Sequence, residues 1–574
     1  MKNKYKKIIS ILSAQQKKTL IFLSSLLILS IGFEVVSLAL LSGFLDLVSG
    51  KELHLFKKIY NYLKDIDINF SFLLDIKFTF LLLIICFCLK NFLMIVVNYK
   101  EGKFINDLKK RVSVNLYKSY IYKNYDYFFS TKLADITRNL TIEINHFSNS
   151  VGSIIKIIIN FSIFFSIFLF LFFHNFFVTV NLFFIFLIFG LGFFYFNSVE
   201  IKNLGRDRPL LIAERLKIIN ETFANIKFLK LKKNNLFLEN FVKTNSLLAY
   251  NGFKTIFLNS LARPVFEIFI LILLFVIFIF ASSKNINFMN ITSNLILYLV
   301  AGYRAMPALN SLIINFQNLH FNIQGIDIIH DIFSKDVNEN KELKENLENY
   351  EKIKFDKDIE FKDVSFFYKT DKIILKKINL KINKFEHIGF IGKSGSGKTT
   401  LTDLLIGLIQ PKEGNILIDG KDFDYRKKLN WQKNIGFVPQ EIYLDNSTII
   451  ENIAYGIKKE NIDLDKIYES LKLANLTNFV KNLPENIYSN VGENGILLSG
   501  GQKQRIGIAR ALYSNPEIII FDECTSSLDE ATELEILNEI NLLKKTKTLI
   551  TISHNDNVHK FCDKIFEINQ GNLK

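Results

Sequence analysis

Six long apolar runs dominate the first part of the chain and constrain its fold more than any other feature. Each is long enough to cross a hydrocarbon core of roughly 30 Å as a helix. They cover residues 19–50, 76–98, 149–174, 176–198, 255–281 and 287–314. From about residue 350, short apolar stretches alternate with polar turns and charged helical segments, which is typical of a soluble α/β domain. The sequence predicts a six-span α-helical transmembrane domain at 1–330, a linker at 331–357 and an α/β domain at 358–574.

The charge pattern predicts how the spans are oriented. The chain has a net charge of +15. Lys-rich stretches such as MKNKYKK contribute to it and flank apolar runs, as the positive-inside rule requires. We therefore expect a cytosolic N-terminus and no nucleic-acid partner. The long charged segments 99–148 and 199–254 are expected on the cytosolic side, as helical extensions of the spans. The four cysteines have no metal-type spacing and are expected to be free thiols.

One substantial segment is expected on the outer side, at residues 51–67. Its apolar positions fall approximately on one helical face, which is compatible with a helix lying at the membrane surface. An ordinary loop helix packed on the protein explains the same pattern equally well.

Three cations fall within the apolar runs: Lys90, Arg263 and Arg304. With the predicted orientation, all three lie in the inner half of the membrane at similar depth. Because a charge inside a membrane normally faces a partner or a cavity, they form a candidate anion site. Structural pairing with Glu34 or Glu267 is the alternative, and Glu267 follows Arg263 at the helical spacing that favours an ion pair.

The strongest motif of the second half is HIGFIGKSGSGKTT, in which an apolar run leads into a phosphate-binding loop. Its glycines let backbone N–H groups surround phosphate oxygens, and the following helix favours an anion at its N-terminus. Lys398 is expected to reach the β- and γ-phosphates and Thr399 to hold Mg²⁺. The predicted nucleotide-binding residues of this motif are Gly392, Ser394, Gly395, Gly397, Lys398, Thr399 and Thr400.

A second acidic site follows the buried-strand pattern EIIIFDE. Asp522 stands where the strand-end carboxylate of phosphate-loop enzymes orients Mg²⁺. The neighbouring Glu523 is a candidate for polarising the attacking water. Two acids capping a strand would mean little alone, but they gain weight beside a phosphate loop.

Between these motifs lies LSGGQ, residues 498–502, and here the chain resembles the ATP-binding cassette (ABC) transporters over essentially its full length. The resemblance implies that Ser499, Gly500, Gly501 and Gln502 close over the ATP held by a second subunit. It further implies that Tyr368 stacks on adenine, that Gln440 senses Mg²⁺, that Asp529 bridges the two nucleotide sites, and that His554 contacts the γ-phosphate. ATP and Mg²⁺ are the implied cofactors, and Glu523, His554 and Lys398 the implied catalytic residues.

The order of the domains resembles the exporter class of this family. One membrane domain and one ATPase domain per chain imply a homodimer, with the ATPase domain in the cytoplasm and the spans in the bilayer. Segments 126–135 and 221–230 stand where the family places the helices that couple the two domains.

The cargo is suggested by a narrower resemblance. The stretch YRAMPALN, together with Arg263 before Pro264 and with Lys90, resembles the bacterial inner-membrane flippases for lipid-linked oligosaccharides of protein glycosylation. That resemblance implies a polyprenyl-pyrophosphate glycan as substrate, with Lys90, Arg263 and Arg304 holding the pyrophosphate. Export of another amphiphile, such as a lipid A-type lipid, a peptide or a drug, is the alternative. A non-transport role as a channel gate or regulator is disfavoured by the complete set of catalytic motifs.

Overall fold

The computed structural model describes residues 2–48, 76–232, 235–283, 292–336, 351–368, 373–523, 530–553 and 560–574. Its contacts divide the chain into a helical unit, residues 1–123 and 131–339, and a second unit, residues 124–130 and 340–574. The predicted outer segment at 51–67 lies outside the described residues.

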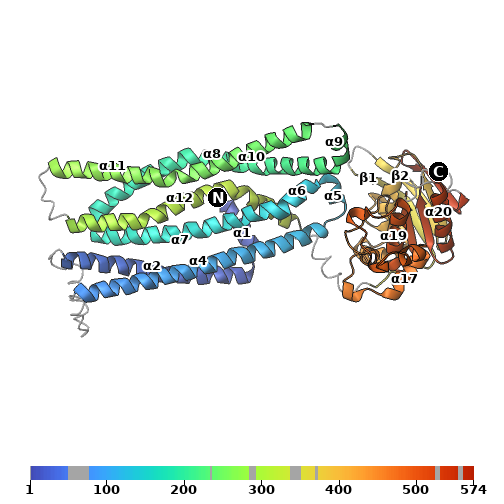
Figure 1. The fold of residues 1–574 in the computed structure, drawn as a ribbon, viewed down its shortest axis with the longest axis horizontal. Coiled ribbons are helices and arrows are strands. Elements are labelled where there is room, and N and C mark those ends of the chain that lie inside the picture. Colours follow the sequence, from blue (N-terminus) through green and yellow to red (C-terminus); the bar gives the residue numbers. More distant parts are fainter. Residues whose placement is uncertain are drawn as a thin grey trace. The chain divides into compact units, whose positions relative to one another are not determined.

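The helical unit consists mainly of long helices, and in α4, α8 and α12 the apolar run continues without a break into a charged segment (Figure 1). The fifth run is divided between α10 and α11, which meet at Leu261. Within the described residues, six helices are long and apolar enough to cross a membrane, which confirms the six-span prediction. At 1.5 Å per residue, the 49 residues of the longest helix extend roughly 70 Å, more than twice the thickness of a hydrocarbon core. The helices are α1 (Lys2–Ile11), α2 (Ala14–Val48), α4 (Ile76–Ile121), α6 (Leu133–Arg138), the π-helix η2 (Asn139–Glu143), α7 (Ile144–His174), α8 (Phe176–Ala224), α9 (Ile226–Lys232), α10 (Leu236–Ser260), α11 (Ala262–Ser283) and α12 (Thr292–Asp336).

Small residues allow α12 to pack closely against its neighbours. Ala301 and Ala305 are buried in one cluster with Leu38 of α2 and Ile167 of α7. Side chains of this size let helix backbones approach each other, which favours association inside a membrane. The same stretch of α12 carries Arg304, so this packing also determines what surrounds that arginine.

The second unit contains an antiparallel sheet of order β2-β1-β4-β5 and a six-stranded sheet of order β10-β9-β3-β8-β7-β6. The strands β9, β3, β8, β7 and β6 run parallel, and the central strands β3, β8 and β7 are buried on both faces, as their apolar sequences require. The predicted α/β class is therefore confirmed. The strands are β1 (Asp358–Phe367), β2 (Ile373–Asn383), β3 (His387–Ile391), β4 (Glu413–Ile418), β5 (Lys421–Asp422), β6 (Ile435–Val438), β7 (Ile518–Asp522), β8 (Thr548–Ile552), β9 (Lys564–Asn569) and β10 (Asn572–Leu573).

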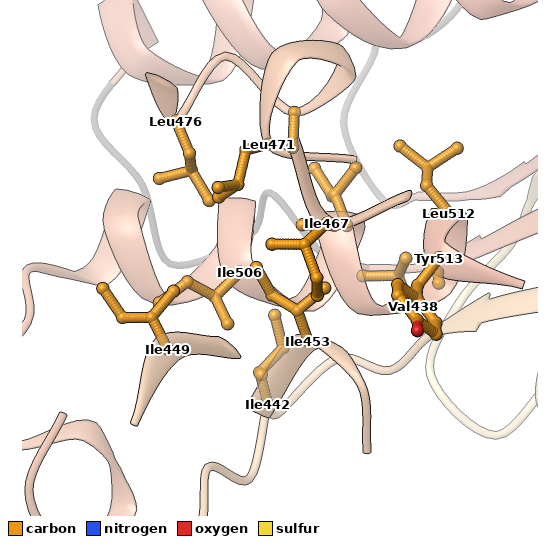
Figure 2. Close-up of a cluster of buried hydrophobic side chains, with 14 of the residues drawn as sticks. Val438, Ile442, Ile449, Ile453, Ile467, Leu471, Leu476, Ile506, Leu512 and Tyr513 are labelled. Carbon is orange, nitrogen blue, oxygen red and sulfur yellow. The ribbon is translucent and has the colours of Figure 1, made fainter. Parts of the chain in front are cut away.

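Two apolar cores support the second unit. One joins both sheets to the helix that follows the phosphate loop and includes the fully buried Trp431. The other, shown in Figure 2, places Ile449, Ile467 and Ile506 from three helices in one cluster that also includes Val438 of β6. The helices of this unit are α5 (Asp126–Ser130), α14 (Lys398–Ile406), α15 (Lys428–Gln432), α16 (Ile449–Ile453), α17 (Leu464–Leu473), α18 (Thr477–Lys481), α19 (Gly500–Tyr513) and α20 (Glu530–Leu543).

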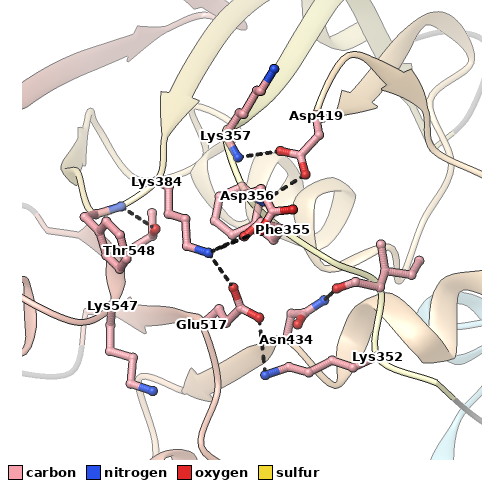
Figure 3. A network of polar contacts seen from close by, with 12 residues as sticks. Lys352, Phe355, Asp356, Lys357, Lys384, Asp419, Asn434, Glu517, Lys547 and Thr548 are labelled. Atoms are coloured by element: carbon pink, nitrogen blue, oxygen red, sulfur yellow. Dashed lines mark hydrogen bonds and ion pairs between the residues drawn. The ribbon is translucent and has the colours of Figure 1, made fainter.

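The chain is anchored where it enters the second unit, as Figure 3 shows. The carboxylate of Asp419 accepts hydrogen bonds from the backbone N–H groups of Asp356, Lys357 and Asp358, at 2.8, 2.7 and 3.1 Å. The carboxylate of Glu517 lies 3.0 Å from the ammonium of Lys384. The contacts of Asp419 fix Asp356 and Lys357, which the sequence assigns to the end of the linker. At the other end, α12 continues through Asp336 into the start of the predicted linker.

Candidate nucleotide site and intramembrane cation cluster

The predicted phosphate loop connects the end of β3 at Ile391 to the start of α14 at Lys398. Gly392 and Gly397 have backbone φ angles of 150° and 112°, which residues other than glycine rarely adopt. A Cβ on Gly392 would also lie 2.3 Å from the carbonyl oxygen of Ile568. The loop therefore requires glycine for both its conformation and its close approach to β9.

Lys398 is turned back onto this loop. Its ammonium donates to the carbonyl oxygens of Gly392 and Lys393, at 2.7 and 3.2 Å, and lies 3.8 Å from the carboxylate of Glu523. Burial lowers the pKa of Lys398, while the nearby Glu523 and Asp522 act in the opposite direction. The structure thus places the predicted phosphate-binding lysine beside both predicted carboxylates.

The predicted acids lie at the end of β7. The side-chain amide of Gln440, two residues beyond β6, donates to the carboxylate of Glu523 at 2.8 Å. Burial raises the pKa of Asp522, and the adjacent Glu523 raises it further. Glu523 itself has a left-handed backbone, with a φ of 47°. Lys398, Gln440, Asp522 and Glu523 are therefore brought together from widely separated parts of the sequence.

Tyr368 lies at the edge of this site, with its hydroxyl 3.4 Å from that of Thr400. Its ring makes edge contacts with Phe366 at 5.0 Å and with Phe129 of α5 at 4.9 Å between centroids. Segment 124–130 is further attached where Lys428 donates to the side chain of Asn124 at 3.3 Å. The sequence predicted a coupling helix here, but its contact with the aromatic residue assigned to adenine could not be read from the motif.

Asp403 is a buried acid that the sequence analysis did not identify. Burial, together with the charges of Asp522 and Asp126, raises the pKa of its carboxyl to about 6. It lies on α14, one turn after the phosphate loop. Nothing in the sequence distinguishes it from an exposed helical aspartate.

The LSGGQ motif forms the start of α19. The hydroxyl of Ser499 accepts a hydrogen bond from the backbone N–H of Gln502 at 3.3 Å, and the Gln502 side chain accepts one from the Ser499 N–H at 2.9 Å. This capping box sets the helix start, and Ser499 and Gly500 are exposed. The other predicted nucleotide residues Asp529 and His554 lie outside the described residues.

The residues of the phosphate loop fit Mg²⁺-ATP. The loop is a cradle in which a Cβ at Gly392 or Gly397 would meet neighbouring atoms within 3.0 Å, and the buried hydroxyl of Ser396 has no hydrogen-bond partner among the residues described. Such a cradle offers backbone N–H groups to phosphate oxygens. Thr399, Gln440 and Asp522 supply the oxygen ligands that Mg²⁺ prefers.

In the helical unit, Lys90 of α4 and Arg304 of α12 meet at one carboxylate, that of Glu34 of α2. Lys90 forms an ion pair with Glu34, and the Arg304 guanidinium lies 3.3 Å from the same carboxylate and 3.1 Å from the hydroxyl of Ser37. The Arg304 guanidinium also lies over the ring of Phe87, 4.1 Å from its centroid. The Glu34 side chain is only 2% exposed. We call Glu34, Lys90 and Arg304 the cation cluster.

Arg263, the third predicted cation, is placed differently. It pairs with Glu267 at 2.8 Å on the surface of α11, as the spacing predicted. Both residues line a cavity of about 1170 Å³ between α7, α8, α11 and α12, together with Tyr303. Among the described residues, no contact joins Arg263 to Lys90 or Arg304.

A buried ionic network at the crossing of α7, α8 and α12 was also missed by the sequence analysis. Arg208 pairs with Glu143 at 3.1 Å, and their side chains are 5% and 0% exposed. Arg208 also donates to the carbonyl oxygen of Phe321 at 3.2 Å, and Asn322 bonds to His146. Glu143 and Arg208 lie in segments that the sequence predicts to be solvent-exposed helical extensions, so nothing in the sequence indicated that they are buried.

Comparison with known families agrees with this geometry. Residues 7–304 match the family described as ABC transporter transmembrane region, and residues 375–526 match the family described as ABC transporter. The chain therefore belongs to the ABC transporters. The solved structure of a bacterial Atm1-family ABC exporter with ATP bound has the same fold, with a TM-score of 0.70 and 19% identity over 98% of this chain and 96% of that one. The chain thus combines a multi-pass membrane domain that has an exporter fold with an ABC ATPase domain.

The individual relatives match only part of this chain and only part of their own length. The ATP-dependent lipid A-core flippase of Francisella tularensis subsp. tularensis (strain FSC 198) is 32% identical over 385 residues, which are 65% of this chain and 61% of that protein. The alpha-hemolysin translocation ATP-binding protein HlyB of Escherichia coli O157:H7 is 43% identical over 215 residues, 37% of this chain and 30% of that protein. The chain therefore spans less than two thirds of the length of these relatives.

Proposed function

We propose that two copies of this chain use ATP hydrolysis to flip a polyprenyl-pyrophosphate oligosaccharide from the cytoplasmic to the outer side of the bacterial inner membrane. The observation that carries this proposal is the cation cluster. It places two cations against one buried carboxylate among membrane helices, which leaves an excess of positive charge. Intramembrane charges of this kind commonly mark substrate paths.

A pyrophosphate suits this cluster chemically. The planar guanidinium of Arg304 can bind two phosphate oxygens at once, whereas the Lys90 ammonium acts as a point charge. A dense anion offsets the desolvation of both groups better than a neutral or zwitterionic cargo. Arg263 lies beside the cavity lined by α11 and α12, and we assign it to the path of the same lipid.

The ATPase chemistry follows from the residues gathered at the end of β7. Glu523 would polarise the attacking water, Lys398 would balance charge on the β- and γ-phosphates, and Thr399, Gln440 and Asp522 would hold Mg²⁺. The hydrogen bond from Gln440 to Glu523 links the metal ligand to the base. Ser499 and Gly500 are exposed at the start of α19, which leaves them available to the nucleotide of a second subunit. Asp529 and His554 keep the roles that the family resemblance implies.

A lipid A-type lipid is the second candidate cargo, and the names of the Francisella relatives favour it. It is also a phosphorylated amphiphile, so the cation cluster alone does not separate it from a polyprenyl pyrophosphate. Peptides and drugs without phosphate make no use of the excess charge.

The test is reconstitution into liposomes with a polyprenyl-pyrophosphate oligosaccharide on one side. We expect ATP-dependent translocation by the wild type, and loss of translocation with retained ATPase in Arg304→Ala. Arg206→Ala is the matched control, because its side chain is 69% exposed on α8. Translocation by Arg304→Ala at the wild-type rate would remove the cluster from the substrate path. Translocation of lipid A but not of the oligosaccharide lipid would select the second cargo.

A further inference from the structure

Glu34 is placed unlike an ordinary structural acid. It projects from α2 between Lys90 of α4 and Arg304 of α12, so a single carboxylate joins three helices. Its side chain is 2% exposed, whereas those of Lys90 and Arg304 are 18% and 11% exposed. The carboxylate is therefore the most buried member of the cluster, and the cations are the more accessible ones.

The cluster is incompletely satisfied. The second terminal nitrogen of Arg304, Nη2, is buried and has no hydrogen-bond partner within the described residues. An unpaired buried N–H of a charged group is costly, so this nitrogen is poised to donate to a further acceptor. Phe87 lies below both cations, with its centroid 4.1 Å from the guanidinium carbon of Arg304 and 5.9 Å from the Lys90 nitrogen. The ring positions the cations without neutralising them.

We propose that Glu34 is an internal substitute for the lipid's phosphate: it holds Lys90 and Arg304 when no anionic lipid is bound, and phosphate oxygens displace it when one enters. The inference rests on the proposed function, since it describes regulation of the same site. Without an internal anion, Lys90 and Arg304 would repel each other in the empty site. With one, release of the lipid exchanges one anion for another and leaves no buried cation unpaired.

This arrangement sets the affinity of the site as well as its charge. Every binding event must break the ion pairs of Glu34, which lowers the net affinity for the anionic lipid. A transporter benefits from this, because a cargo held too tightly is not released on the far side. Removing the carboxylate should strengthen binding and slow translocation.

The test uses Glu34→Gln in the full-length protein in lipid nanodiscs. The amide keeps the size of the side chain and can still accept from Arg304, but it carries no charge. The probes are a polyprenyl pyrophosphate without sugar, the corresponding monophosphate and the uncharged polyprenol. We expect the variant to bind the pyrophosphate roughly tenfold more tightly than the wild type, the monophosphate with a smaller gain, and the polyprenol unchanged. In liposomes, its translocation per unit time should fall.

Glu200→Gln is the matched control, since it removes a carboxylate from another interhelical ion pair, with Lys254 of α10. It should bind all three lipids as the wild type does. Equal or weaker pyrophosphate binding by Glu34→Gln would overturn the proposal and leave Glu34 as a structural ion-pair partner. If Glu34→Gln does not fold, Glu34→Asp replaces it. Its shorter side chain weakens the ion pairs and should tighten pyrophosphate binding severalfold, and the absence of tightening would overturn the proposal equally.

Failure of the inference can be distinguished from failure of the proposed function. If the wild type does not translocate the oligosaccharide lipid, but Glu34→Gln still binds anionic lipids more tightly, the cargo is wrong and the role of Glu34 stands. If the wild type translocates that lipid and Glu34→Gln binds it no more tightly, the cargo stands and the role of Glu34 is wrong.

Discussion

Substituting Gly205 with alanine tests how closely α8 and α12 must approach. A Cβ at this position would lie 2.5 Å from the carbonyl oxygen of Phe321 and 2.8 Å from its Cα. Both are backbone atoms of α12, so no side chain can rotate away to relieve the contact. The helices must therefore separate, and the separation acts on the neighbouring Arg208, which donates to the same carbonyl oxygen at 3.2 Å.

Two terms determine the size of the effect. Overpacking against a rigid neighbour typically costs about 1–3 kcal/mol. Weakening a hydrogen bond from a buried charged group adds roughly 1–2 kcal/mol. We therefore expect Gly205→Ala to lose about 2–5 kcal/mol, a large part of the roughly 5–15 kcal/mol that separates folded from unfolded proteins.

The measurement is the fraction of full-length protein that remains monodisperse in size-exclusion chromatography after heating. Gly192→Ala, on the same helix, is the control, because within the described residues its Cβ would have no neighbour within 4 Å apart from the adjacent residues and the backbone of its own helix. We expect Gly205→Ala to melt several degrees below the wild type, and Gly192→Ala to melt at the wild-type temperature or higher, since alanine favours a helix by up to about 1 kcal/mol. A Gly205→Ala protein as stable as the wild type would refute the inferred close crossing.

Three further predictions concern the second unit. Glu523→Gln should bind ATP normally but hydrolyse it roughly 10²–10⁴-fold more slowly, because the candidate base is lost; comparable hydrolysis would exclude Glu523 as the base. Phe129→Ala should leave ATP hydrolysis largely intact but lower the lipid translocated per ATP, and an unchanged ratio would show that the contact with Tyr368 carries no coupling. Asp403 has a pKa of about 6, above its ordinary 3.8, so its folded form loses stability as the pH rises between these values. At pH 7.5, Asp403→Asn should therefore have a free energy of unfolding roughly 1–3 kcal/mol higher than the wild type and a higher melting temperature. Near pH 4 the difference should disappear.

The parts of the structure that the sequence predicted well depend on neighbours in the chain. The phosphate loop needs glycines at fixed spacing before a helix, and each apolar run is long enough to span a membrane by itself. Such local requirements are visible in a single sequence. The pairing of Arg263 with Glu267 was predictable for the same reason, since both lie on one face of α11.

The parts that were missed depend on contacts between distant residues. Glu34 and Arg304 are separated by 270 positions, and the sequence offered pairing with Glu34 only as an alternative. Arg208 and Glu143 lie in charged stretches that resemble exposed helix, because burial on one face is indistinguishable from solvation until the partner helix is known. Phe129 reaches Tyr368 across more than 200 residues by tertiary packing alone.

The left-handed backbone of Glu523 has a consequence for how this ATPase domain would change if selection for activity were lost. A non-glycine residue in that conformation costs about 1 kcal/mol, which glycine largely avoids and asparagine reduces. Substitutions to these residues would therefore relax the end of β7 while removing the candidate base. The glutamate therefore makes the domain less stable than glycine or asparagine would, and we expect selection for ATP-driven transport to retain it despite that cost. A cassette freed from that selection would drift towards a more stable and inactive state.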